Sequence, residues 1–305
     1  MKKLCIILML GLYLISIPSC KRKSIDSINA PETSTAAPTM ERPRVTIWIH
    51  GTHFWFNKLI PGIKKQKKGL SPASSVPEYF IYNKLIARKL STVDAAQFPY
   101  DHFYLFAWSG QLSFQARQEA AQHLHNELNI LISEYLAKYG SSPEITLITH
   151  SHGGNVALNL AKVKKPESSF AIDRLIMLAV PVQKRTSCFV QDPIFKQVYS
   201  FYSKFDSVQI LDAQGIYEKT ALEKEQGTKI PLFSERLFPS CNNLVQTHMR
   251  FDGIGPFHIS YILWNFIGAL PRILNELACY HDGCHHHVKV FLKKNKFPHI
   301  THLKN

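Results

Sequence analysis

The chain has 305 residues and 45% of them are hydrophobic, which predicts a globular protein with a sizeable core, in one large domain or two small ones. Its formal net charge is +14, with 36 Lys and Arg against 22 Asp and Glu. Basic proteins that bind nucleic acid carry a module in which aromatic and base-reading residues are interleaved. This sequence contains no such module, so we expect no nucleic-acid partner.

The first residues predict an export signal. A basic start precedes a nearly unbroken apolar run, Leu4–Ile17, and Pro18, Ser19 and Cys20 follow this run. We expect a signal peptide over residues 1–19, because the run is too short for a membrane span. Its end resembles the bacterial lipoprotein signal, which implies cleavage before Cys20, acylation of that residue and anchoring to a membrane of the cell envelope. A plain secretory signal with an incidental cysteine is the alternative.

A tether and the first strand follow this signal. Residues 20–43 are rich in Ser, Thr, Ala and Pro and lack apolar periodicity, which predicts a disordered tether. The run Arg44–Ile49 predicts a buried strand that stops at His50-Gly51. Residues 54–92 contain several prolines and glycines and are too long for a plain connector, so we expect a lid or pocket insertion with short helices.

The remaining elements continue as alternating strands and helices. We expect a strand at 103–108, a helix over 116–136 capped by Gly140, a strand before Ser151 and a helix to Lys162, then strands at 174–180, 197–202 and 244–251 and an apolar helix at 259–277. Such alternation predicts an α/β protein with a mostly parallel central sheet that helices cover on both faces.

The basic residues gather in two places, at Lys64 to Lys68 and along residues 289–304. Contact with anionic lipid headgroups fits this clustering and the expected anchor. A solvated face that keeps the protein soluble is the alternative.

The segment around Ser151 has the pattern of a nucleophile turn. A β-branched run ends at His150, and Thr149 and Gly153 lie two positions from the serine on either side. A serine on a sharp turn between strand and helix is held in a strained conformation, so its neighbours at those positions must be small. The amide of His152 then begins the helix beside the hydroxyl, where an oxyanion would form. A Ser/Gly-rich turn of an ordinary doubly wound sheet is the alternative.

A nucleophilic serine needs a base, and the base needs an acid that holds it in one tautomer. In a parallel sheet both come from the ends of later strands, which meet at one edge. Asp206 falls just after an expected strand and is our candidate acid, with Asp192 and Asp212 as rivals. His258 follows the next strand through a glycine-rich loop and is our candidate base, whereas His248 lies inside the strand pattern.

The loop after the first strand, His50-Gly51-Thr52-His53, is expected to supply the second oxyanion donor. Glycine lets the backbone approach a substrate, and we expect the amide of Thr52 to act together with that of His152.

On these residues, in the order Ser151, Asp206 and His258, the chain resembles the α/β-hydrolase superfamily, in particular bacterial serine esterases and lipases. The resemblance covers about residues 44–277 and departs at Thr149, where the commonest form has glycine. It implies the α/β-hydrolase fold and cleavage of carboxylic esters through an acyl-enzyme, without a metal or organic cofactor. Together with the anchor, it implies a membrane-attached enzyme for which lipid or acyl-chain esters are candidate substrates.

The end of the chain does not belong to that pattern. We place the hydrolase domain at residues 44–278 and a basic tail that contains His and Cys at 279–305. The segment Cys279–His287 combines thiols, imidazoles and a carboxylate. It favours a Cys279–Cys284 disulfide over a zinc or copper site, while Cys188 and Cys241 leave other pairings open. The alternative function is a non-catalytic surface lipoprotein that keeps the hydrolase scaffold and binds a partner or a metal.

Overall fold

The computed structural model describes residues 42–52, 68–77, 81–165, 170–210, 212, 214, 227, 237–280, 286–293 and 298–302. All of them lie within the unit Met40–Asn305. The predicted signal peptide, Cys20 and all of the predicted tether except its last two residues lie outside the described residues, as does the first part of the predicted insertion.

The described part of the chain is built on a nine-stranded sheet of order β2-β3-β1-β4-β5-β6-β7-β8-β9. The strands are β1 Arg44–Ile49, β2 Gly69–Pro72, β3 Phe103–Ala107, β4 Glu144–His150, β5 Ile172–Leu178, β6 Phe195–Tyr202, β7 Leu244–Phe251, β8 His286–Leu292 and β9 His299–His302. Neighbours from β3 to β8 pair in parallel, and the edge strands β2 and β9 pair antiparallel. The carboxyl ends of the parallel strands therefore meet at one edge.

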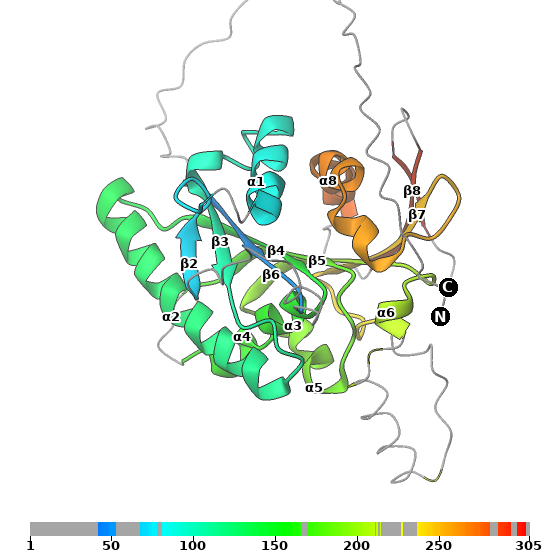
Figure 1. The fold of residues 1–305 in the computed structure, drawn as a ribbon, viewed down its shortest axis with the longest axis horizontal. Coiled ribbons are helices and arrows are strands. Elements are labelled where there is room, and N and C mark those ends of the chain that lie inside the picture. Colours follow the sequence, from blue (N-terminus) through cyan, green and yellow to red (C-terminus); the bar gives the residue numbers. More distant parts are fainter. Residues whose placement is uncertain are drawn as a thin grey trace, which may run out of the picture. The chain divides into compact units, whose positions relative to one another are not determined.

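Helices cover both faces of this sheet. They are α1 Ile81–Val93, α2 Phe114–Tyr139, α3 His152–Leu158, α4 Leu160–Val163, α5 Lys184–Ser187, α6 Ser207–Ile210 and α8 Trp264–Leu277, with a 3₁₀ turn, η6, at His258–Ile262. Figure 1 shows α1 and α8 on one face and α2 to α5 on the other. This arrangement confirms the predicted α/β-hydrolase fold class, a mostly parallel central sheet between two layers of helices.

The alternation of side chains along β1 explains the two cores. Val45, Ile47 and Ile49 pack into the cluster beneath α2 and α3, whereas Trp48 packs into the cluster beneath α1 and α8. Side chains of a strand point alternately to opposite faces, so a strand buried on both sides has to be apolar throughout. This is why the strand was visible in the sequence, and its predicted bounds are confirmed.

The long helix α2 also follows its sequence signals. Ser113 caps its start by accepting a hydrogen bond from the amide of Ala116. Gly140 ends it with φ of 70°, and its amide donates to the carbonyl of Leu136 at 3.0 Å. Along the way α2 passes from the edge of the sheet where β3 ends to the edge where β4 begins.

The structure places regular elements inside two of the predicted segments. Within the predicted insertion at 54–92, β2 extends the sheet and α1 buries Ile86 and Leu90 in the core. The predicted tail at 279–305 contains β8, which pairs with β7, and β9, which returns against β8. Pro72 at the end of β2 and the half-buried His286 and His287 at the start of β8 obscure these strands in the sequence.

The start of the last helix also differs from the prediction. Residues 258–262 form the 3₁₀ turn η6, and α8 begins only at Trp264.

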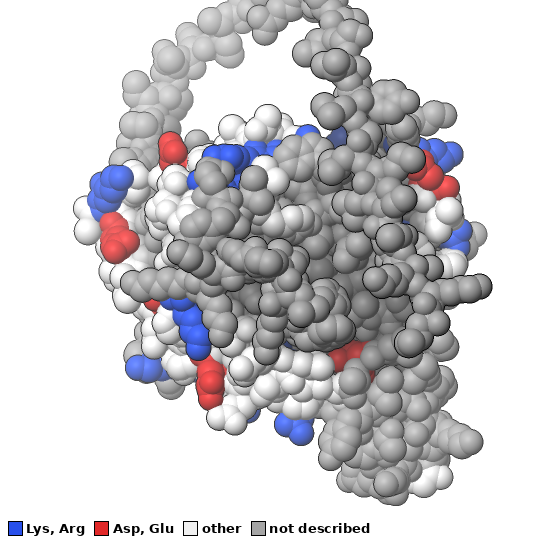
Figure 2. Space-filling model, viewed as in Figure 1, with Lys and Arg blue, Asp and Glu red and all other residues white. Residues whose placement is uncertain are grey.

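The described surface charge is scattered. On the face shown in Figure 2, described Lys and Arg side chains are spread around the periphery, and Asp or Glu side chains lie beside several of them. The described part of that face therefore carries no single field of positive charge.

Candidate active site

Ser151 occupies a strained turn between β4 and α3. Its backbone has φ of 54° and ψ of −136°, a region that a residue with a side chain rarely adopts. Its amide donates to the carbonyl of Leu178 on β5 at 2.9 Å, and only 4% of the residue is exposed. Such strain persists only where the surroundings impose it, so the packing around this turn has to explain it.

Three glycines provide that packing. A Cβ atom on Gly51 would lie 2.7 Å from Cβ of Ser151, and one on Gly153 would lie 2.6 Å from the carbonyl oxygen of Ile49. A Cβ atom on Gly154 would lie 2.2 Å from Cγ2 of Val180. The first turn of α3 is thus pressed against the ends of β1 and β5, where no side chain fits.

Thr149, the position at which the sequence departs from the usual glycine, is fully buried. Its hydroxyl donates to the carbonyl of Ile176 on β5 at 3.2 Å. The extra polar group is therefore satisfied inside the sheet, and the turn tolerates it.

His258 and Asp206 form a buried acid–base pair at the same edge of the sheet. Nδ1 of His258 donates to Oδ2 of Asp206 at 2.9 Å, and Asp206 is fully buried. The other carboxylate oxygen accepts from the amides of Val208 and Gln209, at 3.0 and 3.1 Å. With the proton held on Nδ1, Nε2 of His258 is left to accept one, which is the tautomer that a general base requires.

The rival carboxylates are engaged elsewhere. Asp192 accepts from the ammonium of Lys164 and lies before β6 rather than after it. Asp212 lies 3.4 Å from Nε2 of His152, so it pairs with the residue that follows Ser151 and not with His258. His248, the competing base, stacks on Tyr202 within the sheet.

His150 links the nucleophile turn to the histidine loop. Its Nε2 donates to the carbonyl of His258 at 3.1 Å, and the two imidazole rings lie 4.8 Å apart. Burial, followed by the proximity of His258, lowers the pKa of His150 to about 3. His150 is therefore neutral at physiological pH and brings no positive charge beside the base. No local pattern singles out His150, although its place directly before Ser151 puts it at the edge where the strands end.

The loop after β1 is fixed by His50 and Trp108. The amide of Trp108 donates to Nε2 of His50 at 3.3 Å, which leaves the imidazole proton on Nδ1. Nδ1 then donates to the carbonyl of Gly51 at 2.7 Å, and the indole of Trp108 donates to the carbonyl of His50 at 2.8 Å. Because the peptide is trans, the amide of Thr52 points away from the tethered carbonyl of Gly51.

Two backbone amides are thus candidates for an oxyanion hole. The amide of Thr52 belongs to the loop in which Gly51 touches Ser151, and the amide of His152 is the first of α3, where amides lack an acceptor within the helix. His53 lies outside the described residues.

A buried polar network supports the far side of the turn. Asp212 contacts His152 and accepts from Nε2 of Gln183 at 2.8 Å. Gln183 in turn accepts from Arg117 at 3.0 Å, and Arg117 donates to Gln214 at 2.7 Å. Burial lowers the pKa of His152, against the opposing influence of Asp212. Sequence reasoning missed this network because its members are far apart in the chain and no local pattern connects them.

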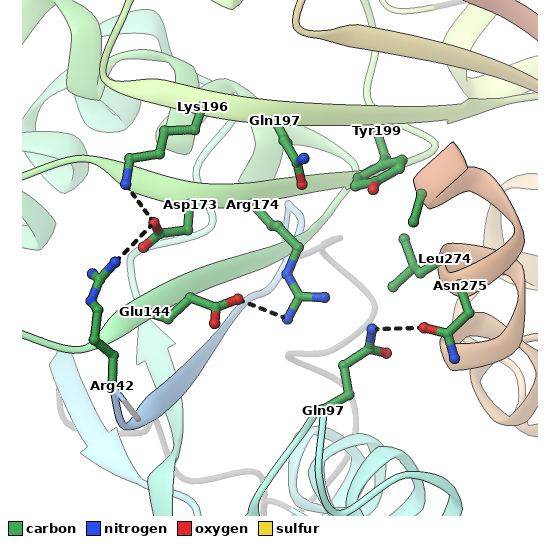
Figure 3. A pocket seen from close by; sticks show the side chains of 11 residues that line it. Arg42, Gln97, Glu144, Asp173, Arg174, Lys196, Gln197, Tyr199, Leu274 and Asn275 are labelled. Atoms are coloured by element: carbon green, nitrogen blue, oxygen red, sulfur yellow. Dashed lines mark hydrogen bonds and ion pairs between the residues drawn. The ribbon is translucent and has the colours of Figure 1, made fainter. Parts of the chain in front are cut away.

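A cavity of about 530 Å³ lies at the opposite edge of the sheet, at the starts of β4, β5 and β6. Figure 3 shows that its charged side chains point at one another: Asp173 contacts Lys196 at 2.7 Å and Arg42 at 3.6 Å, and Glu144 contacts Arg174 at 3.6 Å. These charges satisfy each other, and the cavity is remote from Ser151. It is therefore not the candidate active site.

The cysteines correct one further expectation. Cys188, Cys241 and Cys279 are free, and the thiol of Cys279 donates to the carbonyl of Glu276 at 3.0 Å. The predicted Cys279–Cys284 disulfide is thus not formed, while Cys284 itself lies outside the described residues.

Among the residues that the structure describes, no cluster of three or more His, Cys, Asp or Glu could hold a metal. None of the described helices combines the length and hydropathy that crossing a bilayer requires.

Several solved structures are similar to this chain, although no protein-family model and no curated protein matches it. A hyperthermophilic esterase from the archaeon Pyrobaculum calidifontis is 13% identical, with a TM-score of 0.38 over 79% of this chain and 75% of that one. A thermostable carboxylesterase from a metagenomic library is 11% identical, with a TM-score of 0.40 over 80% and 81%. An alpha-beta serine hydrolase homologue from Coxiella burnetii is 13% identical, with a TM-score of 0.37 over 77% and 88%. Likeness of this degree does not carry an activity from one protein to another.

Proposed function

We propose that this protein is a serine hydrolase that cleaves carboxylic esters through an acyl-enzyme. The observation that carries the proposal is the strained turn of Ser151 at the sheet edge where His258 donates to a fully buried Asp206. Backbone strain that the packing maintains at the end of a strand is a feature of functional sites, and a buried His–Asp pair is the group that activates a serine.

In the proposed reaction, Oγ of Ser151 attacks the ester carbonyl while Nε2 of His258 takes the hydroxyl proton. The carbonyl oxygen becomes an oxyanion that the amides of Thr52 and His152 stabilise. His258 then returns the proton to the leaving alkoxide, which departs as the alcohol and leaves the acyl group on Ser151. A water molecule repeats the sequence, and the carboxylic acid is released.

Electrostatics favour this proton transfer. Asp206 provides a negative charge 2.9 Å from the imidazole that becomes positive, and two amides orient the carboxylate. The neutral state of His150 also favours proton transfer to His258. A second positive charge at the ring separation of 4.8 Å would oppose protonation of His258 by about 3.5 kcal/mol at an effective dielectric constant of about 20. The depressed pKa of His150 removes that penalty.

We further propose that the enzyme is exported and anchored by acyl chains on Cys20 to a membrane of the bacterial cell envelope. The apolar run Leu4–Ile17 and the position of Cys20 after it support this, and both lie outside the described residues. An enzyme held at a membrane meets lipids at high local concentration, so lipid or other acyl-chain esters are the proposed substrate class.

A fluorophosphonate probe tests the catalytic proposal, because such a probe labels only an activated serine. The wild-type protein is expected to be labelled, while Ser151→Ala is not labelled and His258→Ala is labelled far more slowly. Absence of labelling in a correctly folded wild-type protein would favour the alternative, a non-catalytic surface lipoprotein on a hydrolase scaffold that binds a partner or a metal.

A further inference from the structure

Five large apolar side chains are exposed around the His258–Asp206 pair. The exposed fractions are 51% for Phe205, 64% for Ile254, 62% for Phe257, 61% for Ile259 and 51% for Leu263. We call these residues the apolar rim. Isolated apolar side chains are normal on protein surfaces, but a group that surrounds one site marks a surface that contacts something apolar.

The apolar rim is an ordered surface, because the loops that carry its residues pack against each other. A Cβ atom on Gly255 would lie 2.2 Å from Cδ2 of Phe205, so the ring of Phe205 rests on the loop that carries Ile254 and Phe257. The amide of Phe251 donates to the carbonyl of Ile254 at 2.7 Å, which closes that loop into a tight turn. The loops therefore hold apolar side chains outward in an ordered arrangement.

The neighbouring helix α1 also supports the rim. The hydroxyl of Tyr82 donates to the carbonyl of Ile262 at 2.8 Å, directly before Leu263. Three of the five rim residues are next to catalytic candidates in sequence: Phe205 precedes Asp206, and Phe257 and Ile259 flank His258. Whatever the rim contacts is thereby brought close to the candidate catalytic residues.

Basic side chains accompany the rim. Lys289 on β8 is in register with His248 on β7. Burial, and after it the positive charges of Lys204, Lys289 and Arg250, lower the pKa of His248 to about 4. Lys204 is adjacent to Phe205 in sequence, and Arg250 donates to the carbonyl of Gly253 within the rim turn. Asp252 is the acidic residue of that turn, so the positive charges outnumber the negative ones there.

We propose that the apolar rim docks on the surface of an anionic phospholipid membrane and that the candidate active site opens toward the lipid. Apolar side chains of such a surface enter the boundary between headgroups and acyl chains, while nearby cations lie at the level of the anionic headgroups. The choice of lipid over a protein partner follows from this pairing of apolar tips with adjacent cations. The consequence for substrates rests on the proposed hydrolase function, whereas docking itself does not.

An added tryptophan reports whether the rim enters lipid. Full-length Phe257→Trp protein is reconstituted into vesicles whose acyl chains are brominated, and quenching is compared with the wild-type protein, which has four tryptophans. The matched control is Ile130→Trp, because Ile130 is exposed to a similar extent, 57%, on α2, across the sheet from α8. We expect quenching of the tryptophan at 257 and not of the one at 130, and stronger quenching in phosphatidylglycerol than in phosphatidylcholine.

The charge contribution has its own measurement. Lys204→Gln is expected to lower the docked fraction, read from the quenching at 257, with a fall of about fivefold in the partition constant. Equal quenching at 257 and 130, equal quenching on the two lipids, or protection of the rim by a second copy of the chain would each overturn the proposal.

Docking and catalysis can fail separately, and the design distinguishes them. Ser151→Ala in the Phe257→Trp background is expected to show the same quenching. Quenching without fluorophosphonate labelling of the wild type would leave the docking surface in place and refute the hydrolase function. Labelling of the wild type without quenching at 257 would support the hydrolase function and refute the docking surface.

Discussion

Replacing Asp206 by Asn isolates the contribution of the carboxylate to the proposed reaction. Asn keeps the shape of the side chain, and its carbonyl oxygen can still accept from the amides of Val208 and Gln209. Its NH₂ group would then face Nδ1 of His258, where the structure has an acceptor 2.9 Å away. Two donors cannot share that contact, so the imidazole proton moves to Nε2 and blocks the transfer from Ser151.

The size of the loss follows from the geometry. A unit negative charge 2.9 Å from a forming imidazolium stabilises it by about 6 kcal/mol at an effective dielectric constant of about 20. Each 1.4 kcal/mol, approximately, is a factor of ten in rate, so we expect kcat/KM to fall by about four powers of ten. The substrate does not contact Asp206, so KM should change little.

The assay is hydrolysis of a short-chain aryl ester, together with the rate of fluorophosphonate labelling. Asp212→Asn is the matched control, because Asp212 is also buried against a histidine but pairs with His152 and not with the base. We expect Asp212→Asn to lose at most about tenfold in kcat/KM, in line with one altered hydrogen bond outside the reaction. Circular dichroism must show both variants folded. If Asp206→Asn keeps a tenth of the wild-type activity, or if both variants lose equally, the assignment of the acid is wrong.

Four further outcomes are expected. Ser151→Gly should unfold at a temperature roughly 2 to 4 °C higher than the wild type, since about 1 to 3 kcal/mol of backbone strain is relieved against roughly 1 kcal/mol of glycine entropy, and a lower melting temperature would contradict the strain. Gly154→Ala should lose about 1 to 3 kcal/mol of unfolding free energy in denaturant titrations, and adding Val180→Ala should restore part of it, since a Cβ would lie 2.2 Å from the valine. The pKa of His150, about 3 in the folded protein and 6.5 ordinarily, means that the unfolded chain binds the extra proton first. Stability should therefore fall as the pH drops below 6.5, by about 3 kcal/mol at pH 4.5, and His150→Gln should show a shallower fall in the same titration. Cys20→Ser should remove labelling by radioactive palmitate and shift the protein out of the detergent phase; an unlabelled wild-type protein would refute the anchor.

The parts of the candidate site that depend on local pattern and chain order could be proposed from the sequence. Ser151 was recognisable because the residues that allow its turn are its own neighbours. Asp206 and His258 were recognisable because each follows a strand, and parallel strands end at a common edge.

Groups that depend on long-range packing could not be found in this way. Arg117, Gln183 and Asp212 support the turn through contacts between positions far apart in the chain, and each is an ordinary polar residue in its own segment. The role of His150 as a neutral brace depends on its burial against His258, which no local pattern conveys. In β8, buried Val288 and Val290 alternate with His and Lys, and this short alternation was outweighed by the metal-like composition of the segment before it.

The attachment of β8 to the histidine loop makes assembly of the candidate site depend on a strand that is synthesised after all three candidate catalytic residues. Phe251 is in register with Leu292, and the amide of Asp252 donates to the carbonyl of Leu292 at 2.7 Å, just before the loop that carries His258. A growing chain therefore cannot form this hydrogen bond until Leu292 has been synthesised, which is long after the synthesis of Ser151 and Asp206. The proposed base is therefore fixed only after β8 has formed, so the proposed hydrolytic activity has to wait for this strand.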